Sequence, residues 1–180
     1  MKLFQKDRFY TGNMERERKR IMKQKALARW LKVILIGVGI CGLIVFGIIL
    51  PSYGQSLVAR YPEFSNRFWP WLIFLWMTAV PCFIALFFGW RIASNIGRDR
   101  SFSEENALAL ERISHLAAAD SLYFFLGNLV LLLINMSHPG VLLLSLLIVF
   151  AGIAVTVASA ALSHLVYKAA SLQEQSDLTI

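Results

Sequence analysis

The sequence predicts an all-α fold, an integral membrane four-helix bundle whose two termini both lie in the cytoplasm. The first observation is composition: 57% of the 180 residues are hydrophobic and 16% are charged, whereas a soluble domain carries about 25% charged residues. The second is a set of four apolar segments, each close to the roughly 20 residues that a helix needs to cross a bilayer. We predict membrane spans at about 33–50, 70–91, 114–136 and 141–166. Outside this membrane domain of residues 33–168 remain a basic cytoplasmic N-terminal segment (1–32) and a cytoplasmic C-terminal tail (169–180).

The third observation is the uneven distribution of positive charge. Eleven of the 18 Lys and Arg residues lie in residues 1–32, four lie between the second and third predicted spans, and one follows the fourth. The connections on the other side of the membrane hold Arg60 and Arg67. Because cytoplasmic loops carry the excess of basic residues in membrane proteins, this positive-inside pattern places both termini in the cytoplasm.

The N-terminal segment is too long and too charged for the start of a signal peptide, and no small-residue cleavage site follows the apolar run. We therefore interpret it as a retained segment that leads into the first span. Its eight basic residues next to the membrane favour contact with anionic lipid headgroups, at about 1 kcal/mol per charge. Nucleic-acid binding is disfavoured, because the cluster lacks interleaved aromatic residues and a folded scaffold. The eight residues are Arg16, Arg18, Lys19, Arg20, Lys23, Lys25, Arg29 and Lys32.

Proline residues punctuate the first two spans. We expect Pro51 to end the first helix, and we expect the aromatic-rich connection that follows it, up to Trp69, to lie at the outer interface. Pro70 suits the first turn of the second span, where its missing N–H group has no helical partner to lose. Pro81 lies in the middle of that span, where the loss of a backbone hydrogen bond predicts a kink.

The connection between the second and third spans carries signals for the start of a helix. Ser101 with Glu104 fits a capping box, and Ser103 is an alternative cap. Glu104 and Glu105 then fall in the first turn, where the helix dipole favours acidic side chains. We expect the side chain of Phe102 to pack back onto the bundle.

Three polar residues of the third span, Asp120, Asn128 and Asn135, are spaced by eight and seven positions. At 100° per residue they fall within about 80° of one another, which predicts a polar stripe that faces the bundle interior. Polar groups inside a span are costly and face protein or water. The stripe therefore forms interhelical hydrogen bonds or lines a path for protons or substrate, and the sequence leaves both interpretations open.

The fourth span has small residues in its second half, at every fourth position through Gly152, Thr156 and Ala160 to His164, with Ser159 and Ser163 alongside. Stripes of small residues permit close approach of two helices.

We predict no catalytic, cofactor-binding or metal-binding residue, and we expect that the protein is not an enzyme. Cys41 and Cys82 are isolated within apolar segments, which is typical of buried thiols that act as small hydrophobic groups. His115, His164 and Asp120 would meet near one end of spans three and four, but they lack the spacing of a metal-binding motif.

The stretch from residue 98 to 113, RDRSFSEENALALERI, resembles the hallmark of a bacterial membrane family catalogued as domain of unknown function 2975. The family motif is a small residue or Pro, then Phe, two variable residues, Glu and Asn, followed by Leu-x-x-Ile on the same helix. The chain also ends similarly to this family, although Gln175 and Ser176 replace its more usual Glu-Asn. The matching positions are Ser101, Phe102, Glu105, Asn106, Leu110 and Ile113, and at the C-terminus Asp177, Leu178, Thr179 and Ile180.

The resemblance implies a multi-pass protein of the bacterial inner (cell) membrane, often encoded beside a small helix-turn-helix regulator, and it supplies no catalytic residue or cofactor. We therefore expect a membrane-resident regulatory or interaction protein that acts with a soluble cytoplasmic partner. Such a regulator, anionic lipids and a second copy of the chain are the expected partners, without direct nucleic-acid binding. We expect the tail Ser171–Ile180 to dock on the segment Ser101–Ile113. The alternative is a small proton-coupled transporter or channel that uses the polar stripe.

Overall fold

The structure is a computed structural model that describes residues 2–136 and 139–177, with most side chains from Met14 onward. In the described part the chain forms helices without any strand. Four helical segments are long and apolar enough to cross a membrane, which confirms the predicted all-α, four-span fold. These segments are Ile21–Arg60, Ser65–Gly97, Glu104–Leu133 and Gly140–Ser176.

The first span is built from three helical pieces and the other three from one helix each. The short 3-10 helix η2 connects the first span to the second. The elements are α1 (Lys2–Ile44), the π-helix η1 (Val45–Ile49), α2 (Leu50–Arg60), η2 (Pro62–Arg67), α3 (Phe68–Gly97), α4 (Glu104–Leu133) and α5 (Pro139–Asp177).

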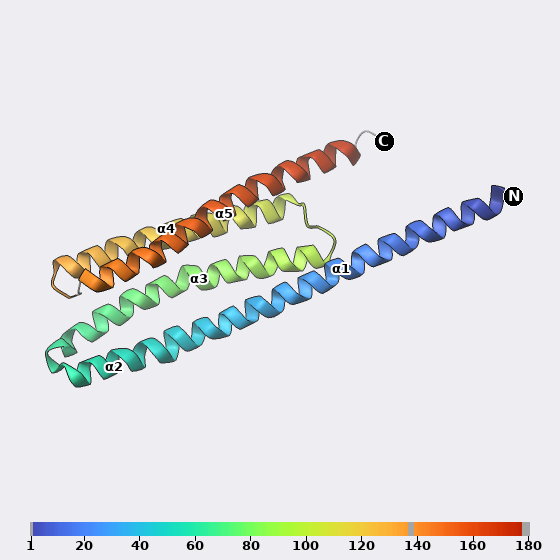
Figure 1. The fold of residues 1–180 in the computed structure, drawn as a ribbon. Helices are drawn as coiled ribbons and strands as arrows, with labels where there is room; N and C mark the ends of the chain where they lie inside the picture. Colours follow the sequence, from blue (N-terminus) through green and yellow to red (C-terminus); the bar gives the residue numbers. More distant parts are fainter. Residues whose placement is uncertain (1, 137–138, 178–180) are drawn as a thin grey trace.

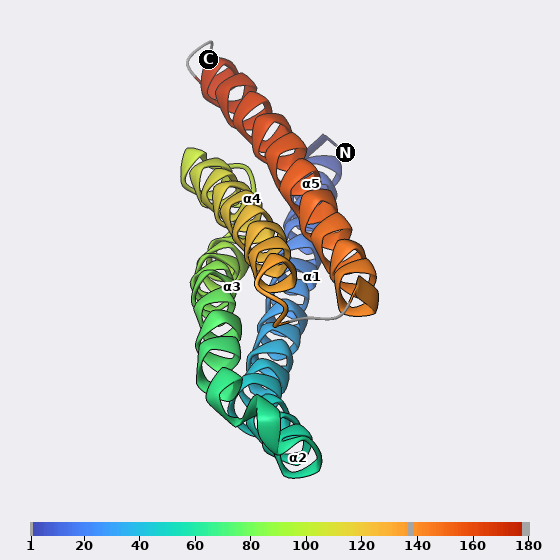
Figure 2. The same cartoon turned by 90° about the vertical axis from the view of Figure 1, so that its left-hand side faces the viewer.

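The helices pack in the order of the sequence, α1 on α3, α3 on α4 and α4 on α5 (Figures 1 and 2). Among the described residues, α1 makes no close backbone contact with α4 or α5. Both ends of the chain and the α3–α4 loop lie at one end of the molecule, and α2 with the α4–α5 connection lies at the other (Figure 1). Four spans, an even number, bring both ends of the chain to the same side. Which side of the membrane that is stays a prediction from the charge distribution.

The prediction that Pro51 ends the first helix is wrong. The helix continues through Pro51 to Arg60, because the chain widens into the π-helix η1 just before the proline. A proline in a helix lacks an N–H donor, and its ring collides with the carbonyl group four residues earlier. In η1 the Leu50 N–H bonds to the carbonyl of Val45, five residues back, so the turn is wide enough to accommodate the ring.

This widening leaves the Phe46 carbonyl without a donor in its own helix, since the next residue in the π register is Pro51. The indole of Trp76 on α3 supplies the missing donor, with 2.9 Å between its Nε1 and the Phe46 oxygen. In hydrocarbon no water can take over that role. The bond therefore links the irregular part of the first span to the first third of α3.

The second span begins as predicted, with Pro70 in the first turn of α3. Pro81 lies inside α3, which remains helical on both sides of it. At the α1–α3 contact, small residues face larger ones or each other. A methyl group added to Gly97 would lie 3.1 Å from Ala28 Cβ, and one added to Gly89 would lie 3.1 Å from Leu35.

Helices α4 and α5 form the closest pair of the fold through small and hydroxyl side chains. Ser114 Oγ donates to the Thr156 carbonyl at 2.9 Å, and Ser163 Oγ donates to the Ala107 carbonyl at 2.7 Å. A methyl group on Gly152 would lie 2.1 Å from Ser121 Oγ, so α4 occupies the space of that missing side chain. Such interhelical hydrogen bonds and close contacts replace the hydrophobic effect, which is absent between helices in lipid.

The stripe predicted on α5 is partly present: Gly152 and Thr156, with Ser159 and Ser163 alongside, face the protein. Between Ser145 and Val166, the residues that are not exposed recur at alternating intervals of four and three, as in an antiparallel coiled coil. Ala160 and His164, predicted to belong to the stripe, are exposed. The observed row is Ser145, Val149, Gly152, Thr156, Ser159, Ser163 and Val166.

Helix α5 also extends further than the predicted fourth span, as far as Asp177. The segment that we treated as a tail is therefore helical over its described part, and it projects beyond the start of α4 (Figure 1). We predicted that the tail Ser171–Ile180 docks on Ser101–Ile113. Its described part continues α5, and residues 172–176 of that part are exposed. Residues 178–180 of the tail lie outside the described residues.

The first prediction concerns the hydrogen bond between Trp76 and the Phe46 carbonyl. Trp76→Phe leaves the Phe46 carbonyl unpaired in an apolar environment, which should cost about 1–3 kcal/mol of stability. We expect a lower midpoint in the thermal unfolding of the purified protein in mild detergent. Trp69→Phe is the matched control, because Trp69 is 60% exposed.

Pro51→Ala restores a backbone N–H next to the unpaired carbonyl, so Trp76→Phe should cost less in that background. An equal loss with and without Pro51 would show that the indole contributes packing and not a hydrogen bond.

Candidate functional site

The most highly organised polar site of the molecule is the turn between α3 and α4, residues 98–103. Ser103 has an extended backbone and caps α4, with its Oγ accepting from the Asn106 N–H at 3.3 Å. Glu104 and Glu105 occupy the first turn, as predicted. Ser101, our first choice as the cap, is not at the helix start, and the alternative Ser103 is confirmed.

Asn106 holds this turn together from the protein interior, and it is only 1% exposed. Its Nδ2 donates to the carbonyls of Arg100 at 2.9 Å and Ser101 at 3.0 Å. Its Oδ1 accepts from Asn95 Nδ2 on α3, at 2.9 Å. One amide group thus bonds both sides of the turn, and we call this set of contacts the Asn106 staple.

Asn95 is the second half of the staple and is 7% exposed. Its Nδ2 also approaches Glu105 Oε2 at 3.3 Å, and its backbone carbonyl accepts from the N–H groups of Arg98 and Arg100. Asp99 adopts the left-handed conformation, with φ of 62°. Asp is among the few residues that tolerate this conformation, which reverses the chain after α3.

The staple holds Phe102 away from the protein, so the prediction that this ring packs back onto the bundle is wrong. Phe102 is 59% exposed, and the neighbouring Arg98, Asp99 and Arg100 are also exposed. The physical reason is that Asn106 binds the carbonyls on both sides of Ser101, which fixes the backbone and directs the next side chain outward. The turn therefore displays an aromatic ring and two guanidinium groups on a fixed backbone.

The remaining motif residues support this turn from α4. Leu110 and Ile113 are half-buried one and two turns beyond Asn106, and Glu105 is exposed beside Asn95. The sequence motif included Asn106 but not Asn95. A polar residue near the end of an apolar helix was the one available signal for Asn95.

The predicted polar stripe is only partly present. Asp120 faces α3, where the Cys82 thiol donates to its Oδ2 at 3.7 Å. Its Oδ1 is buried and has no hydrogen-bond partner in the described part of the chain. Asn128 is 5% exposed and donates to the Phe124 carbonyl of its own helix at 2.8 Å, a contact within one turn.

Asn135 does not belong to the stripe, because α4 ends at Leu133. Asn135 is exposed and adopts the left-handed conformation that commonly follows a helix end, with φ of 55°. Its carbonyl accepts a hydrogen bond from the Arg67 guanidinium. The prediction for Asn135 was wrong because the spacing assumed that the helix continued through it.

Aromatic rings surround the Asp120 side of α4 at the next turn. Phe74 of α3 lies 5.3 Å from the ring of Tyr123 and is stacked with Phe124 at 5.8 Å. A methyl group at Gly127 would lie 2.0 Å from the Phe74 ring, so a larger residue would force the ring or the helix to move. This packing closes the α3–α4 interface on one side of the carboxyl group.

The predicted lipid-facing cluster lies along α1, and five of its eight side chains are described. Arg18, Lys23, Lys25 and Arg29 are exposed, and Lys32 is half-buried with its Nζ 5.0 Å from the centroid of the Trp90 ring. The side chains of Arg16, Lys19 and Arg20 are outside the described part. His115 and His164 are exposed, and within the described residues no group of three His, Cys, Asp or Glu could hold a metal ion.

Comparison with known proteins gives the family. The profile of the family described as "Protein of unknown function (DUF2975)" matches residues 52–180, which include the whole Asn106 staple. The chain belongs to this family. The DUF2975 match confirms the resemblance that the Ser101–Ile113 motif indicated.

A relative of known sequence agrees with this assignment. The chain is 27% identical over 152 residues to a Bacillus subtilis (strain 168) protein called "Uncharacterized membrane protein YoaS", which covers 83% of this chain and 94% of that protein. No solved structure matches the chain. Together with the four apolar helices, the relative shows a membrane protein of the DUF2975 family.

The second prediction concerns the Asn106 staple. Asn106→Asp replaces the Nδ2 donor by an oxygen that faces the carbonyls of Arg100 and Ser101, and we expect a loss of about 1–3 kcal/mol or more. The turn should open, and trypsin should then cleave after Arg98 and Arg100 under conditions in which the unmodified protein resists.

Phe102→Ala is the control for this experiment, because the ring is exposed and makes no contribution to the staple. It should leave the resistance to trypsin unchanged. Equal cleavage of the Asn106→Asp and unmodified proteins would show that the turn is not held by the side-chain amide.

Proposed function

We propose that this protein is a membrane-resident regulatory protein without enzymatic activity, and that it binds a soluble cytoplasmic partner through the α3–α4 turn. The observation that carries the proposal is the exposure of Phe102, at 59%, on a backbone fixed by a buried amide. Inner-membrane location and the cytoplasmic position of the turn come from the resemblance and from the positive-inside pattern.

The turn has the chemistry of a protein-binding hot spot. Aromatic residues and Arg are enriched at the centres of protein interfaces and supply much of the binding energy. Arg98 and Arg100 precede the ring on the same turn, and both are exposed. Since the staple fixes the backbone before binding, little conformational entropy is lost when a partner docks.

The distance of Phe102 from the membrane favours a soluble partner over lipid. The predicted third span starts at residue 114, ten residues after the start of α4. At 1.5 Å per residue this places the turn about 15 Å outside the hydrocarbon on the α4 side. The ring is therefore too far out to insert among acyl chains.

The chemistry of the turn also suggests what the partner offers. An exposed ring on a turn with two exposed guanidinium groups suits an apolar pocket that has carboxylates nearby, because Arg pairs with carboxylates through parallel hydrogen bonds. The family resemblance suggests a small helix-turn-helix regulator as the soluble protein. The end of α5, with the Asp177–Ile180 tail, projects at the same end of the molecule and is our candidate for a second contact (Figure 1).

The third prediction tests the turn directly. A photo-crosslinking amino acid at Phe102, introduced into the full chain in its native membrane, should give one defined adduct with a soluble protein that mass spectrometry identifies. The same amino acid at Leu144, which is 64% exposed on the α5 span, should give none, because lipid surrounds it there.

Two further variants sharpen this test. Replacing Arg98 and Arg100 by Gln should reduce the yield of the Phe102 adduct, and deletion of Asp177–Ile180 should reduce it if the tail contributes. Lack of any adduct at Phe102, in a protein that resists trypsin at the turn, would contradict the regulatory proposal.

A second candidate function rests on Asp120. Its unpartnered buried Oδ1 and its contact with Cys82 are unusual in a structural carboxyl group, since buried polar atoms are normally paired. Intramembrane acidic residues often carry protons in transporters. The reduced stripe weakens this alternative, because Asn135 lies outside the helix and Asn128 bonds within α4.

The fourth prediction separates the two functions. If Asp120 is structural, Asp120→Asn should insert normally and keep the Phe102 adduct, and liposomes that contain the unmodified protein should show no proton flux above that of empty liposomes. Proton flux that depends on the protein, is abolished by Asp120→Asn and survives in Cys82→Ser would move the transporter function ahead.

A further inference from the structure

We propose that two copies of this chain associate in the membrane as a parallel dimer, through the face of α5 that points away from α4. The inference does not depend on the regulatory function proposed above, because it concerns a different surface and a different partner. The contacts on this face form one row, which we call the outer row of α5. Its apolar members are exposed, and they are Ala151, Ala154, Ala158, Ala161, Leu165 and Leu172.

Three helices agree on the level of the cytoplasmic membrane edge. Lys32 of α1 lies 5.0 Å from the centroid of the Trp90 ring, and the Arg112 guanidinium of α4 lies 5.4 Å from the centroid of the Phe88 ring. Both rings belong to α3 and lie near the end of the predicted second span. Basic and Trp side chains prefer the ends of membrane spans. The predicted edge therefore has the same level on α1, α3 and α4.

Two hydrogen bonds carry this level over to α5. Ser114, two residues inside the edge on α4, bonds the Thr156 carbonyl, and Ser163 bonds the carbonyl of Ala107. Ala107 lies about 10 Å further out along α4 than Ser114. Helix α5 therefore passes the predicted edge near Ala158. Residues 141–158 alone give about 27 Å of helix, which is enough to cross the hydrocarbon.

The part of α5 beyond this edge is apolar and exposed. Between residues 157 and 173, Lys168 is the one Asp, Glu, Lys or Arg residue. Leu162, Leu165 and Leu172 are 50%, 62% and 57% exposed. Within the described part of the chain α5 packs on α4 alone, so no other helix covers this surface. A large apolar surface exposed to water is typical of a protein interface.

The outer row has the spacing of a coiled-coil seam. Its positions alternate between intervals of three and four residues from Ala151 to Leu172. Leu165 and Leu172 lie about 160° and 180° around the helix from Ser163, which faces α4. Helix α5 thus has two seams on opposite faces, and α4 fills one of them. Alanine residues permit close helix contact inside the membrane, and the leucines supply apolar area outside it.

The continuity of the row across the membrane edge selects its occupant. Lipid can cover the row only as far as Ala158, and a soluble protein can cover only the part beyond it. A second membrane helix that projects into the cytoplasm at the same depth covers both parts. A second copy of this chain meets that requirement, because all copies insert in the same direction. A two-fold axis along the membrane normal then brings equivalent positions of the two rows together.

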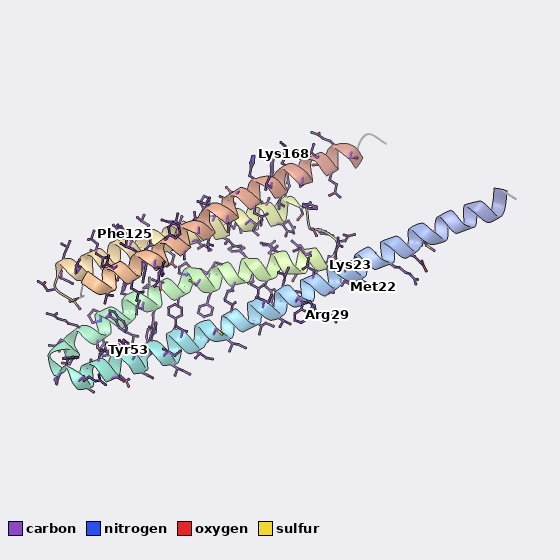
Figure 3. The ribbon with its side chains drawn as sticks, viewed as in Figure 1. Met22, Lys23, Arg29, Tyr53, Phe125 and Lys168 are labelled. Carbon is purple, nitrogen blue, oxygen red and sulfur yellow. The ribbon has the colours of Figure 1, made fainter. Side chains whose placement is uncertain are left out.

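The charge pattern permits this self-association and fixes its register. Lys168 is the one charged member of the row and lies near the projecting end of α5 (Figure 3). In the dimer it faces the partner's Lys168, and a single Lys in a seam specifies register at a cost in stability. The flanking positions carry no Asp, Glu, Lys or Arg that would repel its equivalent. These positions are Leu162 and Ala169 on one side, and His164 and Ser171 on the other.

The experiment is disulfide crosslinking of the full chain in isolated native membranes, in a background of Cys41→Ser and Cys82→Ser. Leu165→Cys and Leu172→Cys should each give a linked dimer on mild oxidation, because equivalent seam positions come within the Cα separation of about 4.4–6.8 Å that a disulfide needs. Tyr167→Cys is the matched control, since Tyr167 is 53% exposed at the same depth but lies about 160° away from Leu165. It should stay monomeric. Equal linking at positions 165 and 167, or linking at neither seam position, would show that the seam does not exist.

A photo-crosslinking amino acid at Leu172 separates the possible occupants. The expected adduct has twice the mass of the chain. An adduct with a soluble protein, or with lipid alone, would assign the row to that occupant and overturn the dimer.

Lys168 tests the register of the two rows. When differently tagged chains with Lys168 and with Lys168→Glu are produced together, mixed dimers should exceed the share expected from random pairing, because a Lys–Glu contact replaces contacts between like charges. Leu165→Gln with Leu172→Gln should lower the dimer fraction at least fivefold and leave membrane insertion unchanged. Random pairing of the tagged chains, or an unchanged dimer fraction in the double variant, would overturn the assignment of the outer row.

Discussion

The structure depends on one constraint, that each backbone carbonyl group released from a helix must find another donor. Regular helices satisfy it within themselves, and the informative places are those at which the helix is interrupted. At Pro51 the freed Phe46 carbonyl is bonded by Trp76 from the neighbouring helix. At the α3–α4 turn, the carbonyls of Arg100 and Ser101 are bonded by the Asn106 amide.

The same constraint explains the end of α4. Arg67, from the connection after the first span, donates to the carbonyl of Asn135 where α4 has stopped. In all three places a side chain from elsewhere in the chain repairs an interrupted helix. Each repair is also a tertiary contact, so the interruptions hold neighbouring helices together instead of weakening the fold.

Helix α4 has a central place in this arrangement. It packs on α3 through Phe74 and Gly127, and on α5 through hydroxyl side chains that bond backbone carbonyls across the interface. Ser163 reaches the Ala107 carbonyl only one residue after Asn106. The staple is therefore supported from both sides, by Asn95 of α3 and by the α5 contact, which explains how a six-residue turn keeps a fixed form outside the membrane.

The sequence was sufficient for features that depend on composition or on local rules. Apolar length predicted four spans, and the preference of acidic residues for a helix start predicted Glu104 and Glu105. It was not sufficient where a distant partner decides the outcome. Pro51 is tolerated because Trp76 lies opposite. Phe102 points outward because Asn106 fixes the backbone before it. Asn135 is not part of the stripe because α4 ends at Leu133. For Asn95 the one signal was a polar side chain near the end of an apolar helix, and it did not identify the partner, which lies on the next helix.

The cations of α3 and of the turn that follows it lie at two different depths relative to the predicted membrane. Arg91 lies next to Trp90 at the level where the cations of α1 meet the predicted membrane edge, whereas Arg98 lies in the turn. Seven residues of helix separate them by about 10 Å, which exceeds the Debye length of about 8 Å at physiological ionic strength. Lipid phosphates that neutralise Arg91 therefore leave the charge of Arg98 largely unscreened by the membrane. One helix thus places one cation at the predicted membrane edge and another where a soluble protein can reach it.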